Sequence, residues 1–253
     1  MSAYGQYCPI AKAADIFAER WTPLIIREMV YGVCRFNELE RGLPGIPRSL
    51  LAQRLRRLEA GGVVERRASP GERSATYHLT PAGQQLETVI EALGTWGAQY
   101  AFADPEPEEL DPLLLLWWMK RRVIFDALPQ RRVVIQIDLH GFKQRSARPG
   151  TYWLVMQPQE VSLCLQHPGF DVDLLVDGDL TALYRIWFGR LTFAEALHEE
   201  LILLHGPAPL VRAFPSWFAL STFAATVRAA SASTASTSTE HETHHSQEAP
   251  DFA

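Results

Sequence analysis

The hydrophobic pattern between residues 45 and 66 predicts a short helix with one apolar face and one polar face. At 100° per residue, Leu51, Leu55 and Leu58 fall together on one side of this helix. The opposite side carries Ser49, Gln53 and Arg56. Two glycines end the helix, and a β-type segment follows. Such a helix suits insertion into the major groove of DNA, although an ordinary surface helix would show the same pattern.

Three further helices are expected ahead of this one. Apolar residues recur at helical spacing from 8 to 20, and Thr22 followed by Pro23 starts a second helix with the threonine as its N-cap. Asn37 and Glu40 stand at capping-box spacing before a short third helix. The chain therefore begins with a closely spaced series of helices.

Two short strands are expected after the amphipathic helix. They cover 63–67 and 75–79, with a polar turn at 69–73 between them. Thr80 and Pro81 then start another helix. A series of helices, an amphipathic helix and a β-hairpin, in this order, are typical of a winged helix-turn-helix.

The helix after residue 80 carries an apolar stripe that is too large for one small domain to bury. The stripe comprises Leu86, Val89, Ile90, Leu93 and Trp96. Pairing of this stripe with that of a second copy, assisted by the first helix, predicts a homodimer. Such a dimer would read a palindrome whose half-sites lie roughly 34 Å apart. The alternative is that the stripe packs onto a second domain of the same chain.

Composition divides the chain into four segments. Residues 1–102 are expected to form the winged-helix and dimerisation domain, and 103–112 an acidic, proline-rich linker. A second domain spans 113–228, and a Ser/Thr/His-rich tail over 229–253 is expected to be disordered. In the second domain, the expected strands are 131–139, 150–156, 161–167, 172–176 and 201–204, and the expected helices lie near 113–128, 179–188, 193–198 and 210–218. This order predicts an α+β fold with a mainly antiparallel sheet.

The distribution of charge is more informative than the net charge of −5. Residues 1–100 hold 12 basic and 10 acidic side chains, and nine arginines and five acidic residues fall within 35–73. A modest basic excess is thereby placed around the amphipathic helix. This basic region makes double-stranded DNA a reasonable partner for an acidic protein.

Several other classes of protein are not expected. The three cysteines have no metal-ligand spacing, which argues against a disulfide scaffold or a metal site. No nucleophile elbow, zinc-protease motif or phosphate loop is present, so neither an enzyme nor a cofactor is expected. Without an apolar run of membrane-spanning length or a leader peptide, we expect a cytoplasmic protein with no membrane partner.

Several short motifs are distributed along the chain from residue 7 to residue 102. The motifs are Cys8-Pro9-Ile10, Arg20-Trp21-Thr22, Arg35-Phe36-Asn37-Glu38-Leu39, Leu43-Pro44-Gly45-Ile46, Leu51, Gln53-Arg54-Leu55, Leu58-Glu59, Gly62-Val63-Val64-Glu65-Arg66, Tyr77, Leu79-Thr80-Pro81 and Gly83. With these motifs the region resembles the HxlR-type group of bacterial winged-helix transcription regulators. That group usually has serine, proline and lysine where this chain has Pro47, Arg48 and Ser49, so the base contacts of this chain can differ.

The residues expected to contact DNA lie on the amphipathic helix and beside it. Arg48, at the start of the helix, would read guanine or bind phosphate, and Arg56 would bind the backbone. Ser49 and Gln53 would project into the groove, where glutamine pairs well with adenine. Arg54 lies near the buried edge, so an intramolecular ion pair is an equal alternative for it.

Two further arginines complete the expected DNA surface. The resemblance implies a phosphate contact for Arg35, just ahead of the third helix. Arg73, at the tip of the wing, would reach a neighbouring groove or phosphate. Each of these arginines could alternatively serve only solubility.

Cys8 precedes Pro9 at the expected N-terminus of the first helix, a setting that favours thiolate reactivity. Some members of the resembled group use a cysteine here to sense electrophiles or oxidants. A redox or electrophile sensor is therefore one functional alternative. An inert, buried cysteine is the other interpretation of the same residue.

A second set of motifs lies in the second half of the chain. These are Val176-Asp177-Gly178-Asp179-Leu180, the run from Phe188 to Ala196 and His205-Gly206-Pro207. They make residues 115–220 resemble sterol-carrier-protein-2-like domains. The resemblance implies a shell of sheet and helices around an apolar cavity, with a small apolar ligand as a regulatory partner.

The aromatic residues expected to line that cavity are Trp117, Phe125, Trp153, Trp187 and Phe193. Packing within a core is the alternative for each of them. A different function follows if the second domain dominates: a lipid or sterol carrier whose N-terminal helices only dimerise.

Overall fold

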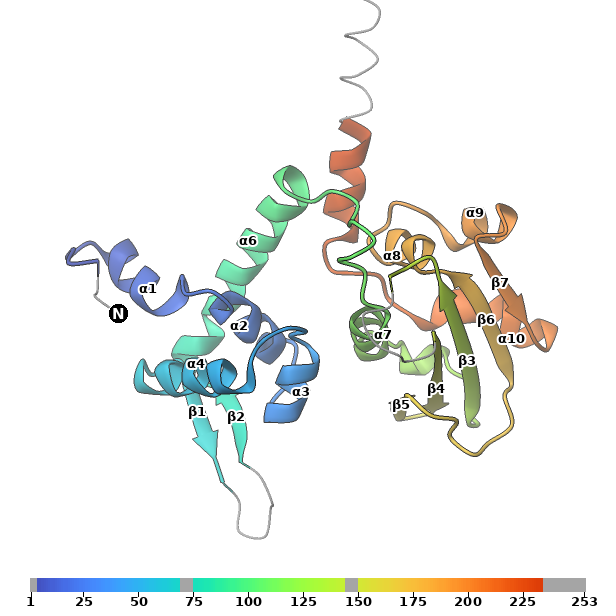
Figure 1. The fold of residues 1–253 in the computed structure, drawn as a ribbon, viewed down its shortest axis with the longest axis horizontal. Coiled ribbons are helices and arrows are strands. Elements are labelled where there is room, and N and C mark those ends of the chain that lie inside the picture. The colour runs from blue at the N-terminus through green and yellow to red at the C-terminus, as the bar shows by residue number, and fades with distance from the viewer. Residues whose placement is uncertain (1–3, 69–74, 144–149, 234–253) are drawn as a thin grey trace, which may run out of the picture. The chain divides into compact units, whose positions relative to one another are not determined.

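The computed structural model describes residues 4–68, 75–143 and 150–233. The chain forms two compact units, 1–94 and 95–253, and α6 (Leu86–Tyr100) runs from the first into the second (Figure 1). None of the helices in the described ranges has the length and hydropathy needed to span a membrane.

The first unit is a winged helix-turn-helix, as the sequence predicts (Figure 1). Its elements before α6 are α1 (Pro9–Phe17), α2 (Thr22–Val30), α3 (Phe36–Arg41), α4 (Arg48–Ala60), β1 (Val64–Arg67), β2 (Thr76–Leu79) and α5 (Pro81–Gln84). The two strands pair antiparallel, with Val64 opposite Leu79. The backbone N–H of Tyr77 donates to the carbonyl of Cys34 at 2.8 Å, so the wing is joined to the segment that leads into α3.

The starts of two helices differ from the predictions. Trp21, with a left-handed φ of 77°, is the N-cap of α2, and Thr22 is its first helical residue. The prediction of Thr22 as N-cap is therefore wrong, and the chain turns sharply before the helix rather than within it. The capping box predicted for Asn37 and Glu40 is also wrong: Arg35 is the N-cap of α3 and no side chain caps it.

The prediction at Thr80 is confirmed, because its hydroxyl accepts a hydrogen bond from the N–H of Gly83 at 3.1 Å. The single helix expected after this cap is instead two. The short α5 ends before Gln85, and α6 begins at Leu86.

The first unit has a core of aliphatic side chains from α2, α3 and α4. Residues with no more than 1% exposure are Ile25, Ile26, Leu39, Leu51, Leu55 and Leu58. Each contributes roughly 1.5–3 kcal/mol by leaving water. The apolar face of α4 is thus buried in the unit, and its polar face is left outside.

The second unit is a five-stranded sheet with helices. Its elements are α7 (Pro112–Arg121), η1 (Phe125–Ala127), β3 (Val133–His140), β4 (Thr151–Gln157), β5 (Glu160–Cys164), β6 (Leu174–Asp179), α8 (Leu180–Trp187), α9 (Phe193–His198), β7 (Ile202–His205), α10 (Ala208–Ala213), η2 (Phe214–Trp217) and a helix over 224–233. The strand order is β5-β4-β3-β6-β7, in which β3 and β6 are parallel and the other neighbours antiparallel. The predicted mainly antiparallel sheet is confirmed.

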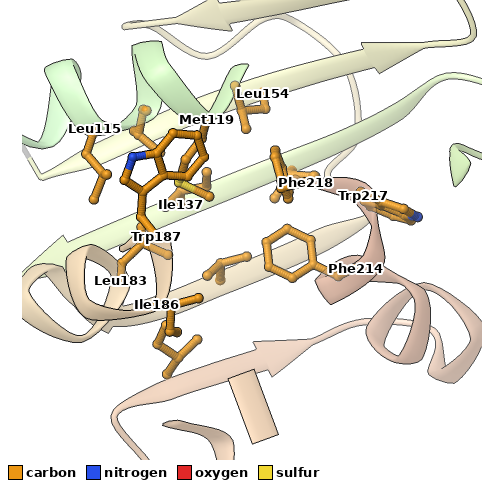
Figure 2. Close-up of a cluster of buried hydrophobic side chains, with 14 of the residues drawn as sticks. Leu115, Met119, Ile137, Leu154, Leu183, Ile186, Trp187, Phe214, Trp217 and Phe218 are labelled. Atoms are coloured by element: carbon orange, nitrogen blue, oxygen red, sulfur yellow. The ribbon is translucent and has the colours of Figure 1, made fainter. Parts of the chain in front are cut away.

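The helices of this unit cover one face of the sheet. Alternate residues of β3, including Ile135 and Ile137, are buried in the same core as α7 and α8. Figure 2 shows Trp187 of α8 in this core with Met119 of α7, and the Phe214 ring lies in it too. Since these side chains come from helices and strands far apart in sequence, this core organises the whole second unit.

The acidic, proline-rich segment at 103–112, which the sequence predicts to be a linker, makes contacts with the rest of the second unit. It belongs to the second unit, and Leu110 within it is only 8% exposed. The carboxylate of Asp104 pairs with both Arg185 and Arg190. The expected linker is thus attached to the second unit by an apolar residue and by arginines distant in sequence.

The predicted tail also starts later than expected. Residues 224–233 are helical, so 229–233 continue a helix of the second unit. The remaining tail, 234–253, lies outside the described residues.

Candidate nucleic-acid interface

The outer face of α4 is open to solvent, as its sequence pattern predicts. Ser49, Gln53 and Arg56 are exposed, while Leu51 and Leu55 on the opposite side are fully buried. The helix begins directly after Pro47, whose carbonyl accepts from the N–H of Leu51 at 3.0 Å. The polar side chains of the first two turns are thereby displayed on a helix that is held firmly from behind.

Arg48 is exposed, but three side chains of α3 contact its guanidinium group. Its Nη1 pairs with the carboxylate of Glu40, and its Nη2 donates to Asn37 Oδ1 at 3.2 Å. Its guanidinium carbon lies 4.9 Å from the centre of the Phe36 ring. The sequence pattern does not predict this arrangement, because the spacing of Asn37 and Glu40 indicates a capping box instead.

Arg54 forms the intramolecular ion pair that was one of its two alternatives. The side chain is buried, with Nη1 2.7 Å from Glu19 Oε2 and Nε donating to the carbonyl of Arg20 at 3.1 Å. Arg57 pairs with the other oxygen of Glu19. These contacts attach α4 to the turn between α1 and α2, and they remove Arg54 from the exposed surface.

Arg35 is exposed at the N-cap of α3, beside the wing. Its backbone forms a bridge with Thr76 of β2. The position places a cation at the joint between α3 and the hairpin. Arg73 lies outside the described residues.

The apolar stripe of α6 is divided by the structure. Ile90 is buried and Leu86 partly buried, while Val89, Leu93, Trp96 and Tyr100 are between 44% and 73% exposed. The exposed four recur at intervals of four, three and four residues, so they share one helix face. Ile10 of α1 and Tyr7, which precedes that helix, are also largely exposed.

Cys8 is the N-cap of α1 and is partly buried. Cys34 and Cys164 are likewise free thiols of intermediate burial. Across the described residues, no group of three His, Cys, Asp or Glu side chains could hold a metal ion.

The five aromatic residues expected to line one cavity do not share one wall. Trp187 is in the core, and the Phe193 ring lies 5.8 Å from that of Phe214. Trp153 alternates with the buried residues of β4 and so faces the opposite side of the sheet, 5.6 Å from the His167 ring. The prediction of a common lining is corrected on this point, because strand alternation separates Trp153 from Trp187.

Trp117 and Phe125 are also placed apart. Trp117 is buried beside the Nζ of Lys120 at 5.3 Å, and Phe125 is 41% exposed on η1. A hollow of about 410 Å³ in this unit has a different lining, namely Arg131, Arg132, Val134, Gly169, Phe170, Asp171 and Asp173. None of the five aromatic residues borders that hollow.

The connector after α6 is held by charge and by ring contacts. Burial raises the pKa of Asp104, but hydrogen bonds and charges from Arg185 and Arg190 outweigh this effect and hold the pKa below its usual value. The Phe102 ring packs 4.7 Å from that of Phe188. Burial likewise raises the pKa of Tyr184, the neighbour of both rings, to about 12. The segment that holds Phe102 and Asp104 is therefore attached to α8 and the residues that follow it.

The comparisons with known proteins concern the first unit and the connector. The HxlR-like helix-turn-helix family matches residues 16–105. An uncharacterised HTH-type transcriptional regulator of Mycobacterium tuberculosis is 44% identical over 101 residues, which are 39% of this chain and 61% of that protein. The chain thus spans about three-fifths of the length of this relative.

The alignment with this chain covers a larger share of two proteins of Bacillus subtilis. The uncharacterised HTH-type transcriptional regulator YvaP is 34% identical over 97 residues, 38% of this chain and 90% of YvaP. The HTH-type transcriptional regulator YodB is 34% identical over 95 residues, 37% of this chain and 85% of YodB. With this coverage, the winged helix of the first unit and the exposed face of α4, the chain belongs to the HxlR-like helix-turn-helix family of transcriptional regulators.

Proposed function

We propose that the protein is a homodimeric transcription regulator that binds a palindromic operator through α4. The observation that carries this proposal is the exposure of Ser49, Gln53 and Arg56 on a helix whose leucines are fully buried. Serine and glutamine can hydrogen-bond to base edges, and arginine to guanine or phosphate. Family membership supports DNA as the ligand of this surface.

The dimer would form through the exposed face of α6 and the start of α1. Leu93 and Trp96 on α6, with Ile10 on α1, present large apolar side chains to solvent. Burial of such side chains against a second copy would stabilise association. A two-fold dimer of this kind would set two α4 helices about one turn of DNA apart, roughly 34 Å.

Within this proposal, the expected contacts divide into two classes. Gln53 and Ser49 would discriminate bases, whereas Arg35, Arg56 and Arg73 would bind phosphates. Arg48 belongs to the same surface, and its role depends on its partners in α3. Contacts to phosphate fix the register of the protein on the duplex but carry no sequence information by themselves.

Selection of bound sequences from random duplex DNA, with the full chain, tests the proposal. A palindromic motif with two equal half-sites is expected. A motif without two-fold symmetry would contradict the dimer, and the recovery of no enriched sequence would contradict the regulator.

We further propose that the second unit resembles a sterol-carrier-type domain and responds to an apolar ligand. Its apolar core lies between one sheet face and helices, and an apolar ligand would have to be accommodated there. A ligand changes operator affinity only by its different affinities for the two states of the protein. Operator binding should therefore be measured with and without a fatty acid. Equal affinities would reduce the second unit to a structural role, and absence of DNA binding with retained lipid binding would favour the carrier alternative.

A thiol sensor is a second candidate, favoured by the position of Cys8 at the N-cap of α1, beside the exposed Ile10. Modification of Cys8 there would place a new group next to the proposed dimer face. Operator binding of a Cys8→Ser variant should then resist a quinone, while a Cys34→Ser variant stays sensitive. Equal sensitivity of both variants would eliminate this role.

A further inference from the structure

We infer that Glu40 is a specificity-determining residue, which holds Arg48 so that its guanidinium binds an uncharged base edge in preference to a phosphate. The inference rests on the proposed function, because it requires that α4 binds DNA. Glu40 acts through Arg48 and is thus a positioning residue.

The contacts of Arg48 show how it is positioned. Glu40 and Asn37 each bind one terminal nitrogen of the guanidinium, and the Phe36 ring lies against one of its faces. These contacts use part of the five N–H donors of the group within the protein. The Arg48 side chain nevertheless remains 61% exposed, so the fixed guanidinium can still reach a ligand.

The charge of Glu40 separates the two possible acceptors. A phosphate that approached Arg48 would also approach the Glu40 carboxylate, and like charges repel. Guanine presents O6 and N7, which accept hydrogen bonds without a net charge. A base edge can therefore bind Arg48 while Glu40 stays in place, whereas a phosphate is opposed.

The same pair limits counterion release. Arg48 and Glu40 together are electrically neutral, so their contact with random DNA releases no counterion. A Glu40→Gln substitution keeps an amide oxygen that can accept from Arg48, but it frees the positive charge of the arginine. Binding to DNA of any sequence should then strengthen, and specificity should fall.

The experiment compares Glu40→Gln with Glu38→Gln, which removes the same charge from the same helix. The full-length variants are titrated with the duplex recovered by selection and with a scrambled duplex of equal length, at several salt concentrations. Relative to the control, Glu40→Gln should bind the scrambled duplex about fivefold more tightly. The dependence of log affinity on log salt should steepen by about 0.9 per subunit. Affinity for the selected duplex should increase less.

An Arg48→Ala background shows whether Glu40 acts through the arginine. There, Glu40→Gln should behave like Glu38→Gln on both duplexes. The inference is overturned if the two substitutions are equivalent in the wild-type background, or if the Glu40 effect persists without Arg48. Failure of the wild-type chain to bind any selected duplex would instead refute the proposed function, and the inference with it.

Discussion

Glu19 forms an ion pair with Arg54 of α4, in which Glu19 Oε2 lies 2.7 Å from Arg54 Nη1 and the side chains are only 13% and 8% exposed. The same carboxylate binds the more exposed Arg57. One acidic residue in the turn after α1 therefore fixes the back of the helix whose front is proposed to read DNA.

Loss of the buried partner should destabilise the first unit. An Arg54→Met substitution leaves the Glu19 charge without its buried partner, and the expected cost is about 3–5 kcal/mol. An Arg57→Met substitution removes an exposed partner of the same carboxylate and should cost less than about 1 kcal/mol. Calorimetric unfolding of the full chain measures the loss of stability for each of the two variants. Equal losses would show that burial of the Arg54 pair is unimportant.

Gln53 and Arg56 should affect DNA binding in different ways. Gln53→Ala should remove about 1–3 kcal/mol of discrimination at one base pair in each half-site. Arg56→Ala should weaken all duplexes alike and reduce the salt slope by about 0.9 per subunit, because it removes a phosphate contact. Titrations with duplexes changed at single positions distinguish these effects. If Gln53→Ala lowers the affinity for all duplexes equally, Gln53 contacts the DNA backbone and not a base.

The exposed face of α6 should control the oligomeric state. Leu93→Asp places a charge in the proposed dimer interface and should convert dimers to monomers in sedimentation equilibrium. Leu203 of β7 has similar exposure but lies on the other unit, so Leu203→Asp is the matched control and should leave the dimer intact. Dimers that survive Leu93→Asp would place the interface elsewhere.

The ion pairs of Asp104 with Arg185 and Arg190, here called the clamp, should respond to acid. Since its folded pKa lies below the unfolded value of 3.8, the clamp contributes stability above that pH and loses it as pH falls through the folded pKa. Asp104→Asn should therefore lower the stability of the second unit at pH 7, and the difference in stability from wild type should shrink below about pH 4. Glu106→Gln, in the same connector, should show no such pH-dependent difference. Parallel curves for wild type and Asp104→Asn would contradict the clamp.

The sequence was sufficient for features set by local periodicity. The wheel of α4 predicts which side of the helix is buried, and α9 spans the predicted 193–198. Both depend on side chains within a few residues of one another, where helical spacing decides burial.

Features set by distant partners could not be read in this way. The connector has the composition of an acidic, proline-rich linker, and this composition does not show that Asp104 binds arginines 81 and 86 residues away. Asn37 and Glu40 have the spacing of a capping box, but their side chains bind Arg48 of the next helix. In both cases a tertiary ion pair overrides a valid local signal.

The most direct test of the central claim is a salt titration of the full chain on duplex DNA that carries the selected motif. A regulator that makes several phosphate contacts through α4 and its neighbours should lose affinity on the order of a thousandfold between 50 and 200 mM salt. Arg56→Ala and Arg35→Ala should each flatten that dependence. Binding that is absent, or that does not change with salt, would contradict the assignment of α4 as a DNA-binding helix.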